Sequence, residues 1–176
     1  MNQNNSILTA DEFWHYTTHR YAMGDIAPLA LLLQDKYAVN VNVLLLVCWC
    51  LEHGFIINLI QLNEIKAAIA QSEDVLIKHR DTRKQARQQL LEQEPSESAK
   101  NAYETLKKQE LELERQQQRI IVDTVNRLNL VPIPHAKSVP ASGVMNASIA
   151  ALINHYSLRD EHEARSLISQ LIQQLP

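Results

Sequence analysis

Glycine, aromatic residues and excess positive charge are all scarce in this sequence. The 176 residues include three glycines, and aromatic side chains make up 5% of the chain. Both values are low for a protein built from β-sheets, whereas residues that favour helices, such as alanine, leucine, glutamine and glutamate, are plentiful. The formal net charge of −3 gives no general attraction to nucleic acid or to an anionic membrane. We therefore predict an all-α protein.

The sequence also lacks a hydrophobic run long enough to span a membrane. Its most apolar segment, residues 39–51 (VNVNVLLLVCWCL), supplies thirteen residues, whereas a spanning helix needs about 20. Asn40 and Asn42 add polar groups within it. No cationic start followed by an apolar region is present, so we predict no signal peptide. The segment is expected to be one helix, buried on most sides, in a cytoplasmic protein that does not bind membranes.

Cysteine is limited to Cys48 and Cys50. Residues at i and i+2 of a helix point roughly 200° apart, so these two thiols cannot form a disulfide without unwinding the helix. They also lack the CxxC spacing of redox and zinc motifs. We expect two buried, reduced thiols, which is typical of a reducing compartment such as the cytoplasm.

Recognisable catalytic and cofactor motifs are missing as well. The chain contains no glycine-rich phosphate loop, no GxSxG and no DxxxD pair. His15 and His19 have the i, i+4 spacing of metal ligands, but no acidic third ligand lies nearby in the sequence. We predict no metal site, no cofactor and no catalytic residues, and the sequence does not decide whether the protein is an enzyme, although it favours a protein that is not one.

Three helices are predicted in an N-terminal module over residues 9–60, after a disordered start at residues 1–8. The pattern Thr9-Ala-Asp-Glu12 is a capping box that begins a helix at about 10–21. Asp25 is a good N-cap for a second helix at about 26–37, and Asn40 for a third at about 40–53. Gly54 stands where a C′ glycine belongs. We predict that the third helix is the centre of this module.

A long antiparallel coiled-coil hairpin is predicted over residues 61–130. Apolar residues recur at steps of three and four on both sides of Glu94-Pro95-Ser96-Glu97, which breaks the helical pattern. Two helices of about 30 residues would each be about 45 Å long. The expected register pairs Ile69 with Ile120, Leu76 with Leu113 and His79 with Glu110.

The C-terminal part, residues 131–176, is predicted to be a proline-containing connector followed by two helices that pack on the N-terminal module. The prolines in NLVPIPHAKSVPASG deny backbone donors and keep the preceding residues out of the α region. One helix is expected at about 143–156, and another after Asp160, which is a candidate N-cap. No β-strand is predicted in the chain, although the alternating VNVNV is the place where that prediction is weakest.

One candidate ligand site lies beside the third helix. Asp35, Asn40, Asn42 and Trp49 could line a polar pocket between the second and third helices. Under the structural alternative, Asn40 caps the third helix and Asn42 hydrogen-bonds a neighbouring turn. The sequence favours the structural alternative.

A second candidate surface is a basic ridge on the outgoing hairpin helix. Arg80, Lys84 and Arg87 share one helix face and could contact RNA phosphates. The alternative is a solvated face that forms salt bridges with glutamates of the returning helix, such as Glu104 and Glu110. Internal salt bridges are the favoured interpretation.

The N-terminal half resembles a known family. The residues that carry the resemblance are Phe13-Trp14, Tyr21, Leu33-Gln34-Asp35, Val41-Asn42, Leu44-Leu45, Trp49 and Gly54. They resemble the signature of a family of small uncharacterised proteobacterial proteins, over about residues 9–60. This chain has Ala38 where that pattern often has glycine, and Asn40 where it often has aspartate, which weakens any case for an acidic metal-binding pair with Asp35. The resemblance implies a domain of unknown function.

These observations lead to one main functional hypothesis and two alternatives. The main hypothesis is a cytoplasmic interaction or adaptor protein that binds a protein partner, or a second copy of itself, through the helical hairpin. The first alternative is a small-molecule-binding protein or unrecognised enzyme that uses the pocket beside the third helix. The second is an RNA-binding or ribosome-associated factor that uses the basic ridge.

Overall fold

The computed structural model describes residues 6–94, 96–133 and 141–176, and the side chains of residues 141–146 are not described. Of the disordered start expected at residues 1–8, residues 1–5 lie outside the described residues, as do residues 134–140 of the proline-containing connector. Residues 6–8 do not behave as a disordered start, because Leu8 is 1% exposed and the backbone N–H of Ile7 donates to Asn126 Oδ1 at 3.0 Å. Within the described residues, the elements in chain order are α1 (Ala10–Tyr21), α2 (Ile26–Tyr37), α3 (Val41–His53), β1 (Phe55–Ile56), α4 (Leu59–Glu92), α5 (Glu97–Arg127), β2 (Val131–Pro132), α6 (Ala141–His155) and α7 (His162–Ile172).

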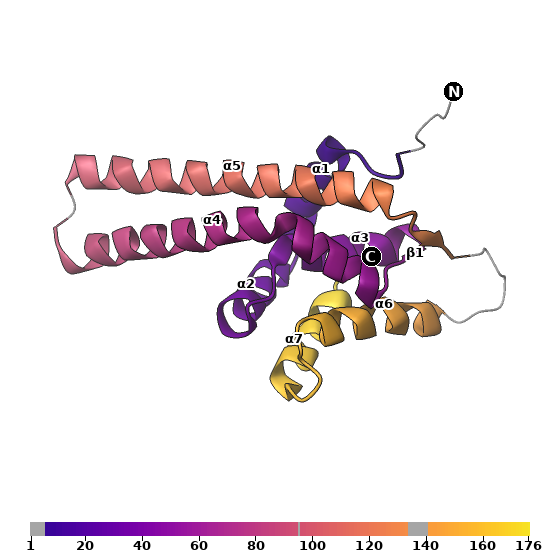
Figure 1. The fold of residues 1–176 in the computed structure, drawn as a ribbon. Helices are drawn as coiled ribbons and strands as arrows, with labels where there is room; N and C mark the ends of the chain where they lie inside the picture. Colours follow the sequence, from indigo (N-terminus) through magenta and orange to yellow (C-terminus); the bar gives the residue numbers. More distant parts are fainter. Residues whose placement is uncertain (1–5, 95, 134–140) are drawn as a thin grey trace, which may run out of the picture.

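The all-α prediction is confirmed, and the long hairpin is its most extended part. In Figure 1, α4 and α5 run side by side and project well beyond the other helices, which gather at one end of the hairpin. None of the helices in the described part of the chain is both long and apolar enough to cross a membrane.

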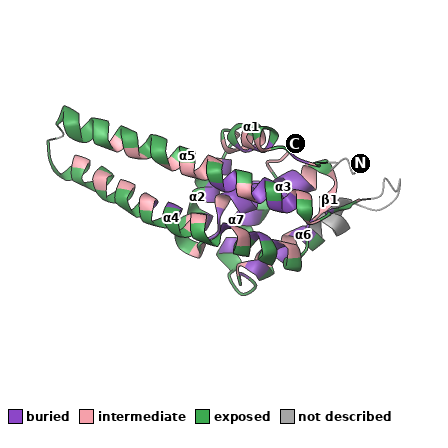
Figure 2. Ribbon diagram, turned by 45° about the horizontal axis from the view of Figure 1, so that its top comes forward, coloured by how far each residue is buried: buried purple, intermediate pink, exposed green. Residues whose placement is uncertain are grey.

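The α3 helix lies at the centre of the hydrophobic core. Every residue from Asn42 to Cys50 is buried (Figure 2). Cys48 and Cys50 are free thiols, as expected, and burial raises the pKa of Cys48 to about 12. Helices α1, α2, α5 and α6 all pack against α3, so it is buried on most sides. An all-round apolar sequence predicts this environment.

The prediction that the chain contains no strand is wrong. Residues Phe55–Ile56 pair antiparallel with Val131–Pro132, and the backbone N–H of Ile133 donates to the carbonyl oxygen of Gly54 at 2.8 Å. The pairing arises because the chain leaves α3 and α5 at neighbouring points. A two-residue strand is too short to show alternation in the sequence. The VNVNV segment instead enters α3, where the Asn40 side chain accepts from the backbone N–H of Val43 at 2.9 Å.

Helix ends follow the predicted caps in part. Thr9 and Glu12 form the expected capping box, and Gly54 ends α3 with a φ of 73°. Asp25 precedes α2 but its side chain makes no capping hydrogen bond; its backbone N–H donates instead to Gln174 Oε1 at 2.7 Å. Asp160 does not cap the last helix, which begins at His162. The N-cap of α7 is Glu161, one residue later, and its side chain makes no capping hydrogen bond.

The two helices of the hairpin differ in burial along their length. Near the body, Leu62, Ile65, Ile69, Leu76 and Arg80 of α4 are buried. From residue 81 to residue 116, none of the described residues is buried, and we call this part the arm. The hydrogen bond between Ser72 and Gln117, at 3.2 Å, agrees with the expected register. His79 also hydrogen-bonds the returning helix, at the carbonyl oxygen of Leu106, at 2.8 Å.

The C-terminal helices pack on the N-terminal module. Helix α7 lies against α2, and α6 lies against α3 and α4. At the surface, Lys36 pairs with Glu163 at 2.8 Å. Deeper in, the hydroxyl of Tyr156 accepts from the backbone N–H of Asn40 at 3.2 Å. The two ends of the chain therefore complete one helical body, from which the arm projects.

Candidate functional site

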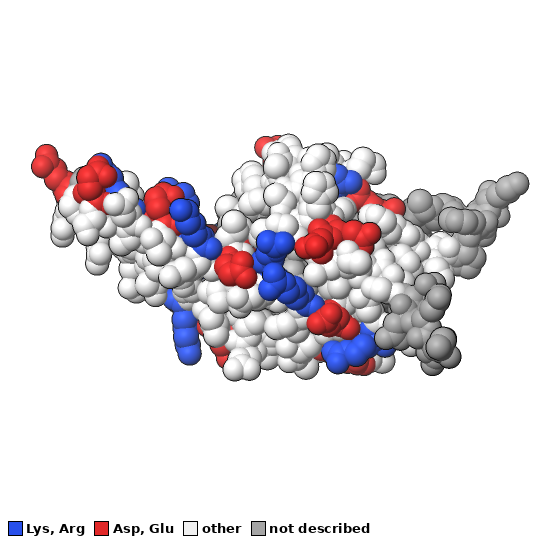
Figure 3. Space-filling view, turned by 90° about the horizontal axis from the view of Figure 1, so that it is seen from above, with Lys and Arg blue, Asp and Glu red and all other residues white. Residues whose placement is uncertain are grey.

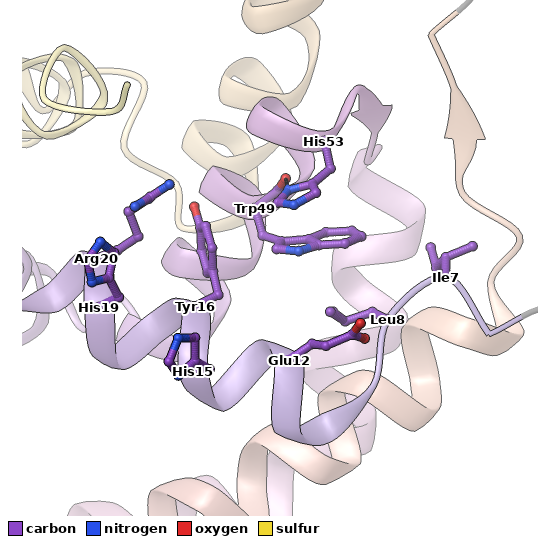
Figure 4. Close-up of a pocket in the computed structure, with 9 residues that line it drawn as sticks. All are labelled: Ile7, Leu8, Glu12, His15, Tyr16, His19, Arg20, Trp49 and His53. Atoms are coloured by element: carbon purple, nitrogen blue, oxygen red, sulfur yellow. Dashed lines mark hydrogen bonds between the residues drawn. The ribbon is translucent and has the colours of Figure 1, made fainter.

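Two cavities flank α1, one on each side of the helix. The first has a volume of about 440 Å³ and lies at the C-terminal end of α3 (Figure 4). The second has a volume of about 360 Å³ and lies between α1, α2, the start of α3 and the base of the hairpin. Their lining residues on α1 fall on opposite faces, because Tyr16 and His19 face the first cavity while Trp14 and Tyr21 face the second.

An ion pair with an added tyrosine forms part of the first cavity's wall. Arg20 donates to Glu52 through Nε at 3.0 Å and through Nη2 at 2.7 Å. The hydroxyl of Tyr16 also donates to Glu52, and the guanidinium carbon of Arg20 lies 5.1 Å from the centre of the Tyr16 ring. Burial raises the pKa of Glu52, but the hydrogen bonds from Arg20 and Tyr16 outweigh it and leave the pKa below its ordinary value. Glu52 is therefore a charged carboxylate, and both of its oxygens accept hydrogen bonds.

Stacked rings form another part of the same wall. Trp49 lies between His53, with ring centres 4.5 Å apart, and Phe55, at 5.5 Å. His53 Nδ1 lies 2.9 Å from the carbonyl oxygen of Trp49 and donates to it. His15 and His19 are exposed at the edge of the cavity, and no group of three or more metal-ligating side chains occurs among the described residues. The first cavity thus offers aromatic surface and a neutralised ion pair.

The second cavity is built differently, with buried polar groups on its inner wall. Gln118 of α5 donates through Nε2 to Thr17 Oγ1 and to Asn42 Oδ1, both at 2.9 Å. Asn42 in turn donates to Gln117 Oε1 at 3.0 Å. Gln117 donates to Glu73 Oε2 at 2.9 Å. We call this series Glu73–Gln117–Asn42–Gln118 the amide chain.

The amide chain has a fixed direction. An ionised carboxylate can only accept, so Glu73 requires Gln117 to turn its Nε2 toward it. Gln117 then accepts from Asn42 through Oε1, and Asn42 accepts through Oδ1. Gln118 must therefore donate to Asn42 from Nε2. The Oε1 atom of Gln118 is left at the end of the chain, and it is buried with no hydrogen-bond partner among the described residues. Leaving such an acceptor unsatisfied costs about 1–3 kcal/mol.

Four charged side chains complete the second cavity. Arg80 is 6% exposed, and lies 3.3 Å from Glu114 and 3.8 Å from Glu110. Arg83 pairs with Glu110. Burial raises the pKa of Glu114 in spite of the nearby Arg80. The Nε–H of Arg80 is buried and donates no hydrogen bond within the described chain. Two basic and two acidic groups therefore balance in charge.

The structure does not bring the four predicted pocket residues together. Asn42 lines the second cavity and Trp49 lines the first, because α1 crosses α3 between them. Asn40 caps α3 and hydrogen-bonds Glu73 and Gln117. Asp35 is exposed and pairs with Lys84 at 2.9 Å. The cavities lie on the α1 side of α3 and not in a pocket formed by these four side chains.

The three predicted nucleic-acid residues do not share an exposed ridge. Arg80 is buried among Glu73, Glu110 and Glu114, which is the internal use that the favoured interpretation expected. Lys84 pairs with Asp35 across to α2, and Arg87 is exposed. An RNA contact would therefore depend on Lys84 and Arg87 and not on Arg80.

Sequence reasoning missed the residues that organise both cavities. Gln117 and Gln118 stand in the polar run RQQQR, residues 115–119 of α5, yet both are buried. A glutamine in the buried stripe of a helix is a signal that could have been read as a polar network. Glu52 and Glu73 gave no such signal, because a glutamate at a helix surface is common and only the tertiary structure shows their partners.

Comparisons with known proteins identify one family. The model of the family described as "Protein of unknown function (DUF2390)" matches residues 12–121, which run from α1 to the middle of the buried part of α5. Neither the comparison with curated proteins nor the comparison with solved structures gave a match. The matched region includes the residues that line the second cavity.

Proposed function

We propose that this chain, which belongs to the DUF2390 family of proteins of unknown function, is a cytoplasmic adaptor that binds a protein partner through the arm. The shape of the hairpin is the basis of this proposal. The helical body holds the arm in place, and the outer surface of the arm, an antiparallel coiled coil, receives the partner. No chemical step is part of this function.

The observation that supports the proposal is an ordered arm that contributes nothing buried. From residue 81 to residue 116 none of the described residues is buried, so the arm adds little hydrophobic stabilisation to the body. Ordering a chain nevertheless costs conformational entropy at every residue. Leu91 on the arm is 73% exposed, and Ile77 at its base is 48% exposed. Exposed apolar side chains on a projecting helix pair suit recognition by another protein.

The charge on the arm favours a protein partner over RNA. Residues 81–116 contain seven basic and eight acidic residues, and Figure 3 shows both signs along the visible side of the hairpin. Neighbouring acidic residues weaken the attraction of any basic group for phosphate. A surface with interspersed charges and a few apolar side chains is typical of protein interfaces outside their centre.

A shortened arm tests the proposal. Deleting residues 85–91 from α4 and 98–104 from α5 removes one heptad from each helix, so the seam keeps its phase and the turn between the helices is retained. The arm becomes about 10 Å shorter. Affinity purification from the native cell with quantitative mass spectrometry should recover a partner with the full-length chain and lose it with the short-arm variant.

Point variants separate the arm from the body. Leu91→Gln changes an arm residue that is 73% exposed, and Ile60→Gln changes a residue of α4 at the body that is 70% exposed. The proposal expects loss of the partner for Leu91→Gln only. Sedimentation shows whether the partner is a second copy of the chain. If full-length protein and the short-arm variant capture identical partners, the arm is not the binding surface.

A further inference from the structure

We propose that the second cavity, at the base of the hairpin, binds a small neutral ligand that carries an amide-type pair of hydrogen-bonding groups, one donor and one acceptor, next to an apolar body. Four of the residues that line this site, Arg83, Glu110, Leu111 and Glu114, belong to the part of the arm next to the body. The segments that the short-arm variant removes, 85–91 and 98–104, contain none of its lining residues, so the two proposals are tested separately. Its volume of about 360 Å³ falls in the range of small-molecule sites and far exceeds the space of one water molecule.

The first step of the argument is the free acceptor. The amide chain that starts at Glu73 fixes the orientation of Gln118, whose Nε2 is used by Thr17 and Asn42. Gln118 is 3% exposed, and its Oε1 has no partner in the described chain. Turning the amide over would set Oε1 against Asn42 Oδ1, so the acceptor cannot be satisfied that way. A ligand that donates a hydrogen bond would satisfy it.

The second step is the free donor and the charge balance around it. Arg80 lines the same cavity, and its Nε–H is buried without a hydrogen bond among the described residues. The Nε atom lies 3.8 Å from Glu110 Oε1, which is too far for a hydrogen bond. The other nitrogens of Arg80 lie near Glu73 and Glu114, while Arg83 pairs with Glu110. Of the four charged residues that line the cavity, two are basic and two are acidic, and Glu73 is not among the lining residues. The lining therefore carries no net charge that would attract an anion or a cation. A neutral ligand that accepts from Arg80 and donates to Gln118 fits both free groups.

The third step is the apolar part of the wall. Trp14 and Tyr21 of α1 line the cavity on one side, with Leu31 of α2 and Leu111 of α5. Leu31 is 42% exposed and Leu111 is 53% exposed, so both lie where a ligand would enter. An apolar or aromatic ligand body would cover side chains that otherwise face water.

Two matched pairs of compounds serve as probes. Nicotinamide and uracil are neutral and carry a donor and an acceptor on one edge, as a carboxamide and as a cyclic imide. Orotate keeps the uracil ring with its imide and adds a carboxylate, whereas nicotinate keeps the pyridine ring and replaces the carboxamide with a carboxylate. Each is titrated into the ¹⁵N-labelled full-length protein while the side-chain resonances of Gln118 Nε2 and Arg80 Nε are followed by NMR. We expect saturable shifts of both resonances with at least one neutral probe, and binding at least tenfold weaker for its charged counterpart.

Variants assign the effect to the cavity. Gln118→Met removes the acceptor, and Gln116→Met makes the same change at an exposed glutamine two residues earlier. Leu31→Glu puts a charge at the entrance without disturbing the core, and Leu32→Glu is its control, since Leu32 is 44% exposed and does not line the cavity. Affinity should fall at least tenfold for Gln118→Met and Leu31→Glu and stay within twofold for the controls.

Each outcome of these titrations either supports the proposal or overturns it. Binding of nicotinamide alone assigns a carboxamide ligand, and binding of uracil alone assigns a nucleobase-like ligand. The proposal is overturned if neither neutral probe shifts the two resonances, if the charged probes bind equally well, or if Leu31→Glu binds like Leu32→Glu. Because Leu31 is outside the core, this last comparison remains decisive even if Gln118→Met fails to fold.

Discussion

Gln118 donates its side-chain amide to Oδ1 of Asn42 at 2.9 Å, joining the returning hairpin helix to the centre of the core. Both residues are buried. Because each amide in the series from Glu73 to Gln118 fixes the next, the hairpin meets α3 in one register and one rotation. The base of the arm is therefore held by directional bonds as well as by apolar packing.

Removing Gln117 should destabilise the protein strongly. Its Oε1 accepts from Asn40 and Asn42, and its Nε2 donates to Glu73. Gln117→Leu therefore takes the acceptor from Asn42 and a donor from Glu73, while Asn40 keeps Glu73 as an acceptor. At about 1–3 kcal/mol for each unsatisfied group, we expect a loss of about 3 kcal/mol in the free energy of unfolding. Urea denaturation measures it. The control is Gln116→Leu at an exposed position, where a change within about 0.5 kcal/mol is expected; equal losses for the two variants would contradict the role of the buried amide.

Truncating the centre of α3 should be equally costly for a different reason. Leu46 is fully buried, and Leu46→Ala removes buried methyl groups and leaves a cavity in the core. Such changes cost about 2–5 kcal/mol. The comparison is Ile60→Ala, because Ile60 is 70% exposed, and its effect in the same denaturation experiment should be much smaller. A loss below about 1 kcal/mol for Leu46→Ala would mean that α3 is not the centre of the core.

Stability should depend on the charge of Glu52 only at low pH. The folded protein holds the pKa of Glu52 below its ordinary value of 4.5, since hydrogen bonds from Arg20 and Tyr16 outweigh burial. A lowered folded-state pKa contributes stability that is complete above the unfolded-state value and is lost as pH falls through the folded-state value. The difference in unfolding free energy between wild type and Glu52→Gln should therefore be constant above about pH 5, and shrink below pH 4.5. A difference that stays unchanged down to pH 3 would contradict this assignment.

The two thiols should be inert in the folded state. Cys48 is 1% exposed and Cys50 is fully buried, and burial raises the pKa of both. Thiolate is the reactive form, so neither should react with Ellman's reagent at neutral pH until the chain unfolds. Adding the reagent with and without urea measures the contrast. Rapid reaction of either thiol without denaturant would show that this part of α3 opens to solvent.

The sequence predicted the helices well because their signals are local. The capping box at Thr9, the cap at Asn40 and the glycine after α3 each act within a few residues, and the structure has all three. The two-residue strands gave no such signal, because Phe55 and Pro132 meet only after two long helices have returned the chain to its starting point. The candidate sites were predicted less well for the same reason.

Three residues show which properties could not be predicted from the neighbouring sequence alone. Arg80 looks like an exposed basic residue from its spacing, yet it is buried because three glutamates surround it. Asn42 and Trp49 share one face of α3, and the sequence grouped them in one pocket. Helix α1 crosses that face and leaves them in different cavities.

The sequence by itself determined which segments are helical, where most of them begin and end, and that α3 would be buried, because backbone capping and apolar periodicity act over one or two turns. Only the tertiary structure decided which polar groups face each other, that Gln118 and Arg80 keep an unused acceptor and donor beside one cavity, and that the arm projects without burying its residues. Those properties depend on contacts between residues far apart in the chain, and their free energies are set by burial and geometry that no short stretch of sequence encodes.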